Sequence, residues 1–143
     1  MSGGRIEKIR RLYVSPQFAK FLAVGGVALA LHWLARIAFN TFMGYGPAIV
    51  LAYGVGILVA YGLNRVFVFP DSKQARHREV MWFVAVNLGA FPFVWAIAYA
   101  LGDLVLARFM AADLARALGH GAAITTPVFV NFALHKFVTF KSG

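Results

Sequence analysis

The sequence has no cysteine and little charge. Only 13% of its 143 residues are charged, about half of the roughly 25% found in an average soluble domain. Hydrophobic residues make up 61% of the chain. A soluble chain of this size still exposes about 30% of the surface that its unfolded form exposes, so it could not bury this much apolar surface. The composition therefore excludes a soluble globular domain and a disordered chain. The missing cysteines exclude a disulfide-stapled module, thiolate metal sites and thiol redox chemistry.

Four stretches are long and apolar enough to cross a bilayer, which requires about 20 such residues. They run over about 18–42, 47–69, 80–106 and 118–140. Gly44, Gly46 and Pro47 supply turn chemistry between the first two, which predicts a tight hairpin. The stretch 103–119 has two possible interpretations, an extension of the third span or a short interfacial helix. We predict an all-α integral membrane bundle of four transmembrane helices in a single domain, 1–143.

Basic residues are distributed unevenly between the two sides of this bundle. Eleven Lys and Arg residues lie in 1–20, in the central loop with the end of the second span, and at the C-terminal end. The other side has only Arg108 and Arg116, each near an aspartate. By the positive-inside rule, both termini and the basic segment 1–17 should be cytoplasmic. Residues 5–12 could also lie on the anionic leaflet as a basic amphipathic turn or two, and a pure topology signal is the open alternative.

The two halves of the chain are similar to each other. Residues 20–25 (KFLAVG) match 82–87 (WFVAVN), and residues 64–69 (NRVFVF) match 135–140 (HKFVTF). Each half would begin and end in the cytoplasm, so the pattern predicts two parallel hairpin repeats related by an axis along the membrane normal.

These segments, with 18–26 (FAKFLAVGG), the four spans and the length, resemble the GtrA-like family over residues 18–140. The resemblance implies a multi-pass protein of the bacterial cytoplasmic (inner) membrane. Its expected function is flipping of a polyprenyl-phosphate-linked monosaccharide for cell-surface polysaccharide or lipopolysaccharide modification. The alternative is a non-transporting scaffold that positions a glycosyltransferase. The chain departs from the family pattern at His135, where an Asn is expected, and at His32, where relatives carry an acidic or amide side chain.

Ionisable groups inside a membrane are costly, so each needs an explanation. Arg65 and Lys136 end their spans at the cytoplasmic face, with Asn64 and His135 beside them. We predict that these four residues bind the phosphate headgroup, with lipid anchoring as the alternative role of the two cations.

Two further candidates lie deeper in the first span. His32 and Arg36 are one helical turn apart, and Arg36 lies beyond the membrane midplane. They would receive the headgroup during transfer. The alternative is that Arg36 snorkels to the outer interface while His32 bonds a neighbouring helix.

Small residues repeat every four positions along the second span, at Ala48, Ala52, Gly56 and Ala60. Such a stripe lets helix backbones approach closely. It predicts helix packing, either within the bundle or across the interface of a homo-oligomer, most simply a dimer.

The sequence also lacks the patterns of several other functions. No span has an acidic residue in its middle, which disfavours an exporter of cations and favours an anionic substrate. It has no G-x-S-x-G, no phosphate-binding Gly-Lys-Ser/Thr loop and no helical His pair joined by a carboxylate. We therefore expect no enzyme, no metal and no cofactor. The basic charge is explained by membrane topology, so no nucleic-acid partner is expected.

Overall fold

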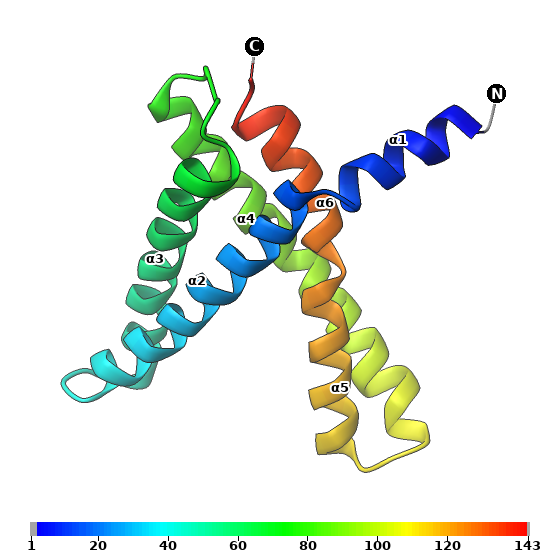
Figure 1. The fold of residues 1–143 in the computed structure, drawn as a ribbon. Coiled ribbons are helices and arrows are strands. Elements are labelled where there is room, and N and C mark those ends of the chain that lie inside the picture. The colour runs from blue at the N-terminus through cyan, green and yellow to red at the C-terminus, as the bar shows by residue number, and fades with distance from the viewer. Residues whose placement is uncertain (1–2, 143) are drawn as a thin grey trace. The chain divides into compact units, whose positions relative to one another are not determined.

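The computed structural model describes residues 3–142 and is helical throughout (Figure 1). Met1, Ser2 and Gly143, the ends of the predicted domain 1–143, lie outside the described residues. The helices of the described chain are α1 (Gly3–Tyr13), α2 (Pro16–Asn40), α3 (Tyr45–Leu63), η1 (Asn64–Val68), α4 (Arg76–Tyr99), η2 (Ala100–Val105), η3 (Leu106–Arg108), α5 (Ala112–Thr125), α6 (Pro127–Leu134) and η4 (His135–Thr139).

Joined end to end, the helices from α2 to η4 make four segments that are long and apolar enough to cross a membrane. They are Pro16–Asn40, Tyr45–Val68, Arg76–Arg108 and Ala112–Thr139. Large apolar side chains cover their outer surfaces; Phe91 and Phe93, for example, are 67% and 70% exposed. Surfaces of this kind are suited to lipid and would aggregate in water. The predicted all-α architecture with four candidate spans is confirmed.

The boundaries differ most in the stretch 103–119. The third span continues to Arg108, and the fourth begins at Ala112 rather than near residue 118. The turn between them contains Phe109 and Met110, and Ala111 at the start of α5 makes no side-chain cap. Without glycine, proline or a capping side chain, the turn carries none of the usual sequence signals. The extension of the third span describes the first part of this stretch, up to Arg108, whereas the second part, from Ala112, belongs to the fourth span.

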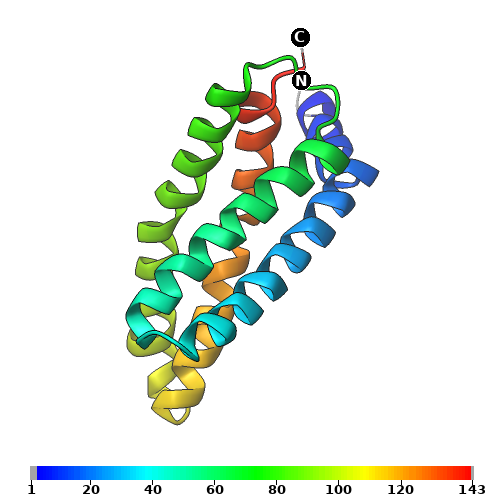
Figure 2. The ribbon, with the colours of Figure 1, turned by 90° about the vertical axis from the view of Figure 1, so that its left-hand side faces the viewer.

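The chain divides into two compact units, residues 3–73 with residue 142, and residues 74–141. In unit 1, α2 and α3 pack side by side as an antiparallel hairpin (Figures 1 and 2). Ser15 begins α2, because its hydroxyl oxygen accepts a hydrogen bond from the Phe18 N–H at 3.1 Å, and Pro16 occupies the first turn. Ala48 and Ala52 are fully buried within this unit.

In unit 2, α4 packs against α5 and α6. The backbones of η2 and α5 approach closely at Gly102 and Gly119, where a Cβ added to Gly119 would stand 2.6 Å from the Gly102 nitrogen. Near this crossing, Arg116 Nε donates to Asp103 Oδ1 at 2.7 Å. Pro127 begins α6, because a proline has no N–H to continue the hydrogen-bond ladder of α5. Small residues therefore bring the helices of unit 2 together, as they do in unit 1.

Candidate functional site

Two π-helical segments, η1 and η4, hold the polar pairs predicted at the cytoplasmic helix ends. The Phe69 N–H donates to the Asn64 carbonyl, and the Phe140 N–H donates to the His135 carbonyl, both at 2.8 Å. The backbone that follows each segment is also alike, with φ −127° and ψ 54° at Phe69 and φ −114° and ψ 64° at Phe140. Isolated π turns are rare in proteins, and those that occur are often found at functional sites. Equivalent positions of the two halves thus share one local geometry, while the arrangement of two parallel repeats stays a prediction.

Asn64 is buried at the end of α3 in unit 1. Its side-chain Nδ2 donates to the Ala60 carbonyl at 2.8 Å. Its Oδ1 is also buried and has no hydrogen-bond partner among the described residues. A buried acceptor without a partner costs about 1–3 kcal/mol. Asn64 therefore offers an acceptor to a hydroxyl or water that reaches it.

Arg65, the next residue, turns back toward the chain that follows it. Its Nη1 donates to the carbonyls of Phe69 at 3.2 Å and Pro70 at 2.9 Å, and its Nη2 donates to that of Ser72 at 3.3 Å. Gln17 holds the same region from α2, since its Nε2 donates to the Val68 carbonyl at 2.9 Å. Arg65 thus stabilises the turn after η1, a role that its sequence position did not suggest. Phosphate binding by Arg65 stays a prediction.

His135 occupies the matching position in unit 2 and is buried. Its Nδ1 lies 3.0 Å from Thr139 Oγ1, and its ring stacks on Phe83 with the ring centres 4.5 Å apart. The ammonium of Lys136 lies 5.8 Å from the centre of the Phe132 ring, within the range of a cation–π interaction. His135 is therefore fixed by packing and a hydrogen bond in the part of unit 2 where the headgroup site is predicted.

Two polar residues that pack in this part of unit 2 were not predicted from the sequence. Glu79, which the predicted third span over 80–106 leaves in the central loop, lies in the first turn of α4 and is 0% exposed. Its spacing of four residues from the buried Phe83 is the signal that could have placed it on the inner face of α4. Gln74 donates from its Nε2 to the carbonyls of Val138 at 2.8 Å and Thr139 at 3.1 Å. A contact between residues 64 positions apart leaves no local sequence signal.

His32 lies in the middle of α2 and packs against α3. A Cβ added to Gly56 would stand 3.0 Å from the His32 Cβ, and the His32 ring lies edge-on to Tyr53 at 6.2 Å. Its Nδ1 is buried without a hydrogen-bond partner among the described residues. Gly56 precedes Asn64 by eight residues, so His32 lies about 12 Å deeper along α3 than Asn64.

Arg36 lies one turn further along α2, toward the hairpin turn. Its guanidinium carbon lies 5.6 Å from the centre of the Tyr45 ring, at the start of α3. Unit 1 therefore has Asn64 and Arg65 at one end, His32 between, and Arg36 near the other end. His135 and Lys136 are neighbours in unit 2.

The small-residue stripe of α3 is used inside unit 1. Ala48 and Ala52 are fully buried, Gly56 faces His32, and Ala60 is partly exposed. Of the two alternatives for this stripe, these contacts favour helix packing within the bundle. The homodimer stays a prediction.

A groove of about 680 Å³ opens on unit 2 between α4 and the α6–η4 segment. Its walls are almost entirely apolar, and the polar side chains that line it are those of Thr126 and Asn131. It reaches from Trp82 to Ile97 along α4, about 22 Å. Leu134 and Val138 line it next to His135 and Lys136. The groove suits a long apolar chain. Among residues 3–142 no cluster of three or more His, Asp or Glu side chains could hold a metal ion.

Comparison with protein families gives one match. The model described as "GtrA/DPMS, transmembrane domain" covers residues 20–140 of the chain. This range includes all four candidate spans except the first four residues of the first span. Among the curated proteins and the solved structures, nothing matches.

Proposed function

Because this chain belongs to the GtrA/DPMS transmembrane-domain family, we propose that it moves a polyprenyl-phosphate-linked monosaccharide from the cytoplasmic to the outer leaflet. The family is consistent with the handling of lipid-linked sugars by a membrane domain that is generally not catalytic. In this proposal the protein is a multi-pass protein of the bacterial cytoplasmic membrane with both termini in the cytoplasm. Its product would serve the modification of polysaccharide or lipopolysaccharide at the cell surface.

The observation that carries this proposal is the apolar groove of unit 2. An isoprenoid chain is apolar along its whole length and gains by lying against apolar side chains. The groove follows α4 for about 22 Å, which is most of a hydrocarbon layer roughly 30 Å thick. Its lining ends beside His135 and Lys136, so a lipid tail in the groove would place its phosphate near a cation.

The headgroup would be handled by the polar residues of each unit. In unit 2, the Lys136 ammonium supplies charge for the phosphate, and His135 lies beside it. In unit 1, Asn64 Oδ1 and His32 Nδ1 are buried atoms that accept or exchange hydrogen bonds with sugar hydroxyls, at depths about 12 Å apart. Arg65 would exchange its carbonyl partners for phosphate oxygens, and Arg36 would receive the charge near the far end of α2.

The test uses purified protein alone in liposomes that contain a polyprenyl-phosphate-linked sugar. Periodate, which does not cross the bilayer, oxidises only the sugars on the outside. With active protein the whole pool should become oxidised; without it, only the outer half. Arg65→Lys should weaken lipid binding, and Arg36→Ala should leave binding intact while slowing movement. Full activity in a folded Arg36→Ala, Arg65→Ala double variant would contradict the headgroup assignment.

The second candidate function is a scaffold that positions a glycosyltransferase. It predicts that the liposomes stay half oxidised with or without the protein, while a glycosyltransferase co-purifies with the chain. A homodimer belongs to the transport proposal, because four helices enclose little room for a sugar. Its test is the mass of the protein in gentle detergent.

A further inference from the structure

The helix α1 precedes the α2–α3 hairpin and presents an apolar stripe. Ile6, Ile9 and Tyr13 follow one another at helical spacing, so they lie on one face. Ile6 is 66% exposed and Ile9 is 57% exposed, although both are large aliphatic side chains. The following residue Val14 is also exposed. An exposed apolar stripe next to a membrane span indicates a surface that is covered by lipid or by another protein.

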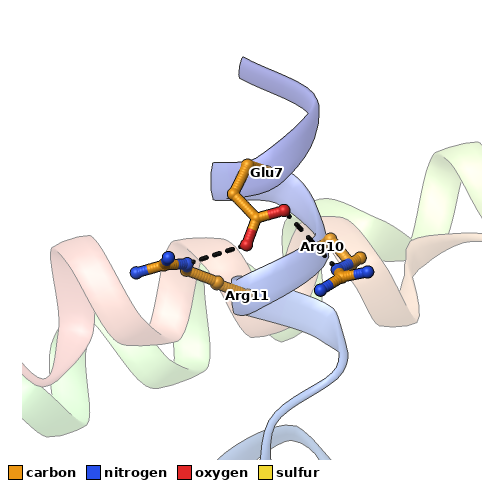
Figure 3. A network of polar contacts seen from close by, with 3 residues as sticks. All are labelled: Glu7, Arg10 and Arg11. Atoms are coloured by element: carbon orange, nitrogen blue, oxygen red, sulfur yellow. Dashed lines mark hydrogen bonds and ion pairs between the residues drawn. The ribbon is translucent and has the colours of Figure 1, made fainter. Parts of the chain in front are cut away.

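The rest of α1 is basic. Lys8 and Arg11 lie opposite the stripe, Arg10 lies at its edge, and the carboxylate of Glu7 lies between the two arginines (Figure 3). The distances are 3.0 Å from Glu7 Oε1 to Arg11 Nε and 3.6 Å from Oε2 to Arg10 Nε. With Arg5, the helix has four cations and one anion. A basic polar face opposite an apolar stripe is the pattern of a helix that lies in the membrane interface.

A single serine fixes the bend that separates α1 from the first span. The Ser15 hydroxyl donates to the Leu12 carbonyl at 2.8 Å and accepts from the Phe18 N–H at 3.1 Å. It therefore closes one helix and begins the next. The Tyr13 ring packs edge-on against Phe18 across the bend, with the ring centres 5.3 Å apart. The chain changes direction here, so α1 does not continue the axis of α2 (Figure 2).

We propose that α1 binds the surface of an anionic lipid leaflet, with Ile6 and Ile9 inserted among the headgroups and the cations against lipid phosphates. The span that begins at Pro16 keeps α1 at the membrane boundary, so even a weak attraction is enough to hold it there. Each Lys or Arg near an anionic surface strengthens such binding about fivefold. The charge of α1 thus complements the leaflet, whereas its apolar stripe alone would fit many partners.

The test uses the full chain, which has no cysteine of its own, in bilayers of phosphatidylcholine with or without phosphatidylglycerol. An environment-sensitive dye is attached to Ile9→Cys on the apolar stripe or to Gly4→Cys on the opposite face, where an added Cβ meets nothing within 4 Å. Lipids with a nitroxide on the acyl chain quench the dye only when it is inserted. We expect strong quenching at position 9 in the anionic bilayer and weak quenching at position 4.

Salt and charge variants complete the test. Raising salt from about 0.1 M to 1 M shortens the screening length from about 10 Å to 3 Å and should weaken quenching at position 9. Replacing Lys8 with Gln should lower the ratio of inserted to free α1 about fivefold. Equal quenching at the two positions, or quenching at position 9 that is the same without anionic lipid, would overturn the proposal. The size-exclusion profile in each case reports whether the hairpins are folded.

Discussion

Replacing Gly119 with alanine tests the close approach of α5 to the end of the third span. The new Cβ would stand 2.6 Å from the Gly102 nitrogen, 2.8 Å from its Cα and 3.2 Å from the Ala98 carbonyl oxygen, whereas ordinary contact begins at 3.4 Å. All three neighbours are backbone atoms, so no side-chain rotation can relieve the overlap. The two helices must move apart by most of an ångström.

The cost follows from the packing that this movement disturbs. Ala115 and Ala123 are fully buried on the same face of α5, one turn on either side of Gly119, and both would lose contacts. Overpacking of this kind costs about 1–3 kcal/mol, which corresponds to an unfolding equilibrium shifted by about 5- to 150-fold. In an α-helix alanine is more favourable than glycine by about 1 kcal/mol, which works against this cost. A net loss of stability in Gly119→Ala would therefore show that the overlap with Gly102 outweighs the gain in helix propensity.

Gly121→Ala is the matched control. It lies in the same helix, and an added Cβ there meets nothing within 4 Å. Thermal unfolding in detergent, followed by circular dichroism and by fluorescence-detected size exclusion, should give a lower midpoint for Gly119→Ala than for the parent. Gly121→Ala should unfold at the parent midpoint or above it. Equal midpoints for the two variants would refute the close backbone contact at Gly102.

Three further predictions follow from the described contacts. Gly56→Ala should lower the unfolding midpoint relative to Gly54→Ala, because only the first meets His32, whose Cβ is the nearest atom. In a His32→Gly background, which lacks that Cβ, Gly56→Ala should no longer lower the midpoint, and a loss of the same size would contradict the contact. His135→Asn should fold like the parent, because Asn64 shows that an amide fits the equivalent position of unit 1. His135→Leu should lower the free energy of unfolding by about 1–3 kcal/mol, because the Thr139 hydroxyl then has no partner. Equal stability of these two variants in detergent would argue against that hydrogen bond. A cysteine in place of Tyr45 should react with an impermeant maleimide added outside intact cells, and labelling from the cytoplasm only would reverse the predicted orientation.

The hydrophobic runs predicted the helices well because hydropathy is a property of each segment by itself. The glycines and the proline at 44–47 located the first hairpin turn, and α3 begins at Tyr45. The second turn could not be located in the same way, since Phe109 and Met110 are apolar and Ala111 makes no cap. A span is therefore predictable from composition, whereas a turn is predictable only where its residues have turn preferences.

The candidate site was predictable in its positions and less so in its contacts. Asn64 and His135 were singled out because they are polar at apolar helix ends, and both are buried. The three carbonyls that Arg65 contacts depend on the π-helical backbone of η1, which no sequence spacing indicated. Glu79 was missed because charged residues in its neighbourhood made the whole segment look like a loop. Contacts that depend on backbone irregularities or on distant partners need the folded chain.

The π-helical end of each hairpin determines which changes in chain length the protein can tolerate. A π turn holds one residue more than an α turn, so removing Val66 or Phe67 would let the Phe69 N–H meet the Asn64 carbonyl as an ordinary α-helical bond. Phe69 and the carbonyls that Arg65 contacts would then stay close to their present places. Removing a residue within α3 would instead turn everything after it by about 100°. Val66 and Phe67 are exposed, so both their replacement and the deletion of one of them should leave this end folded. Natural relatives should therefore vary in residue type at these two positions, and a difference of one residue in length should be tolerated here better than within α3.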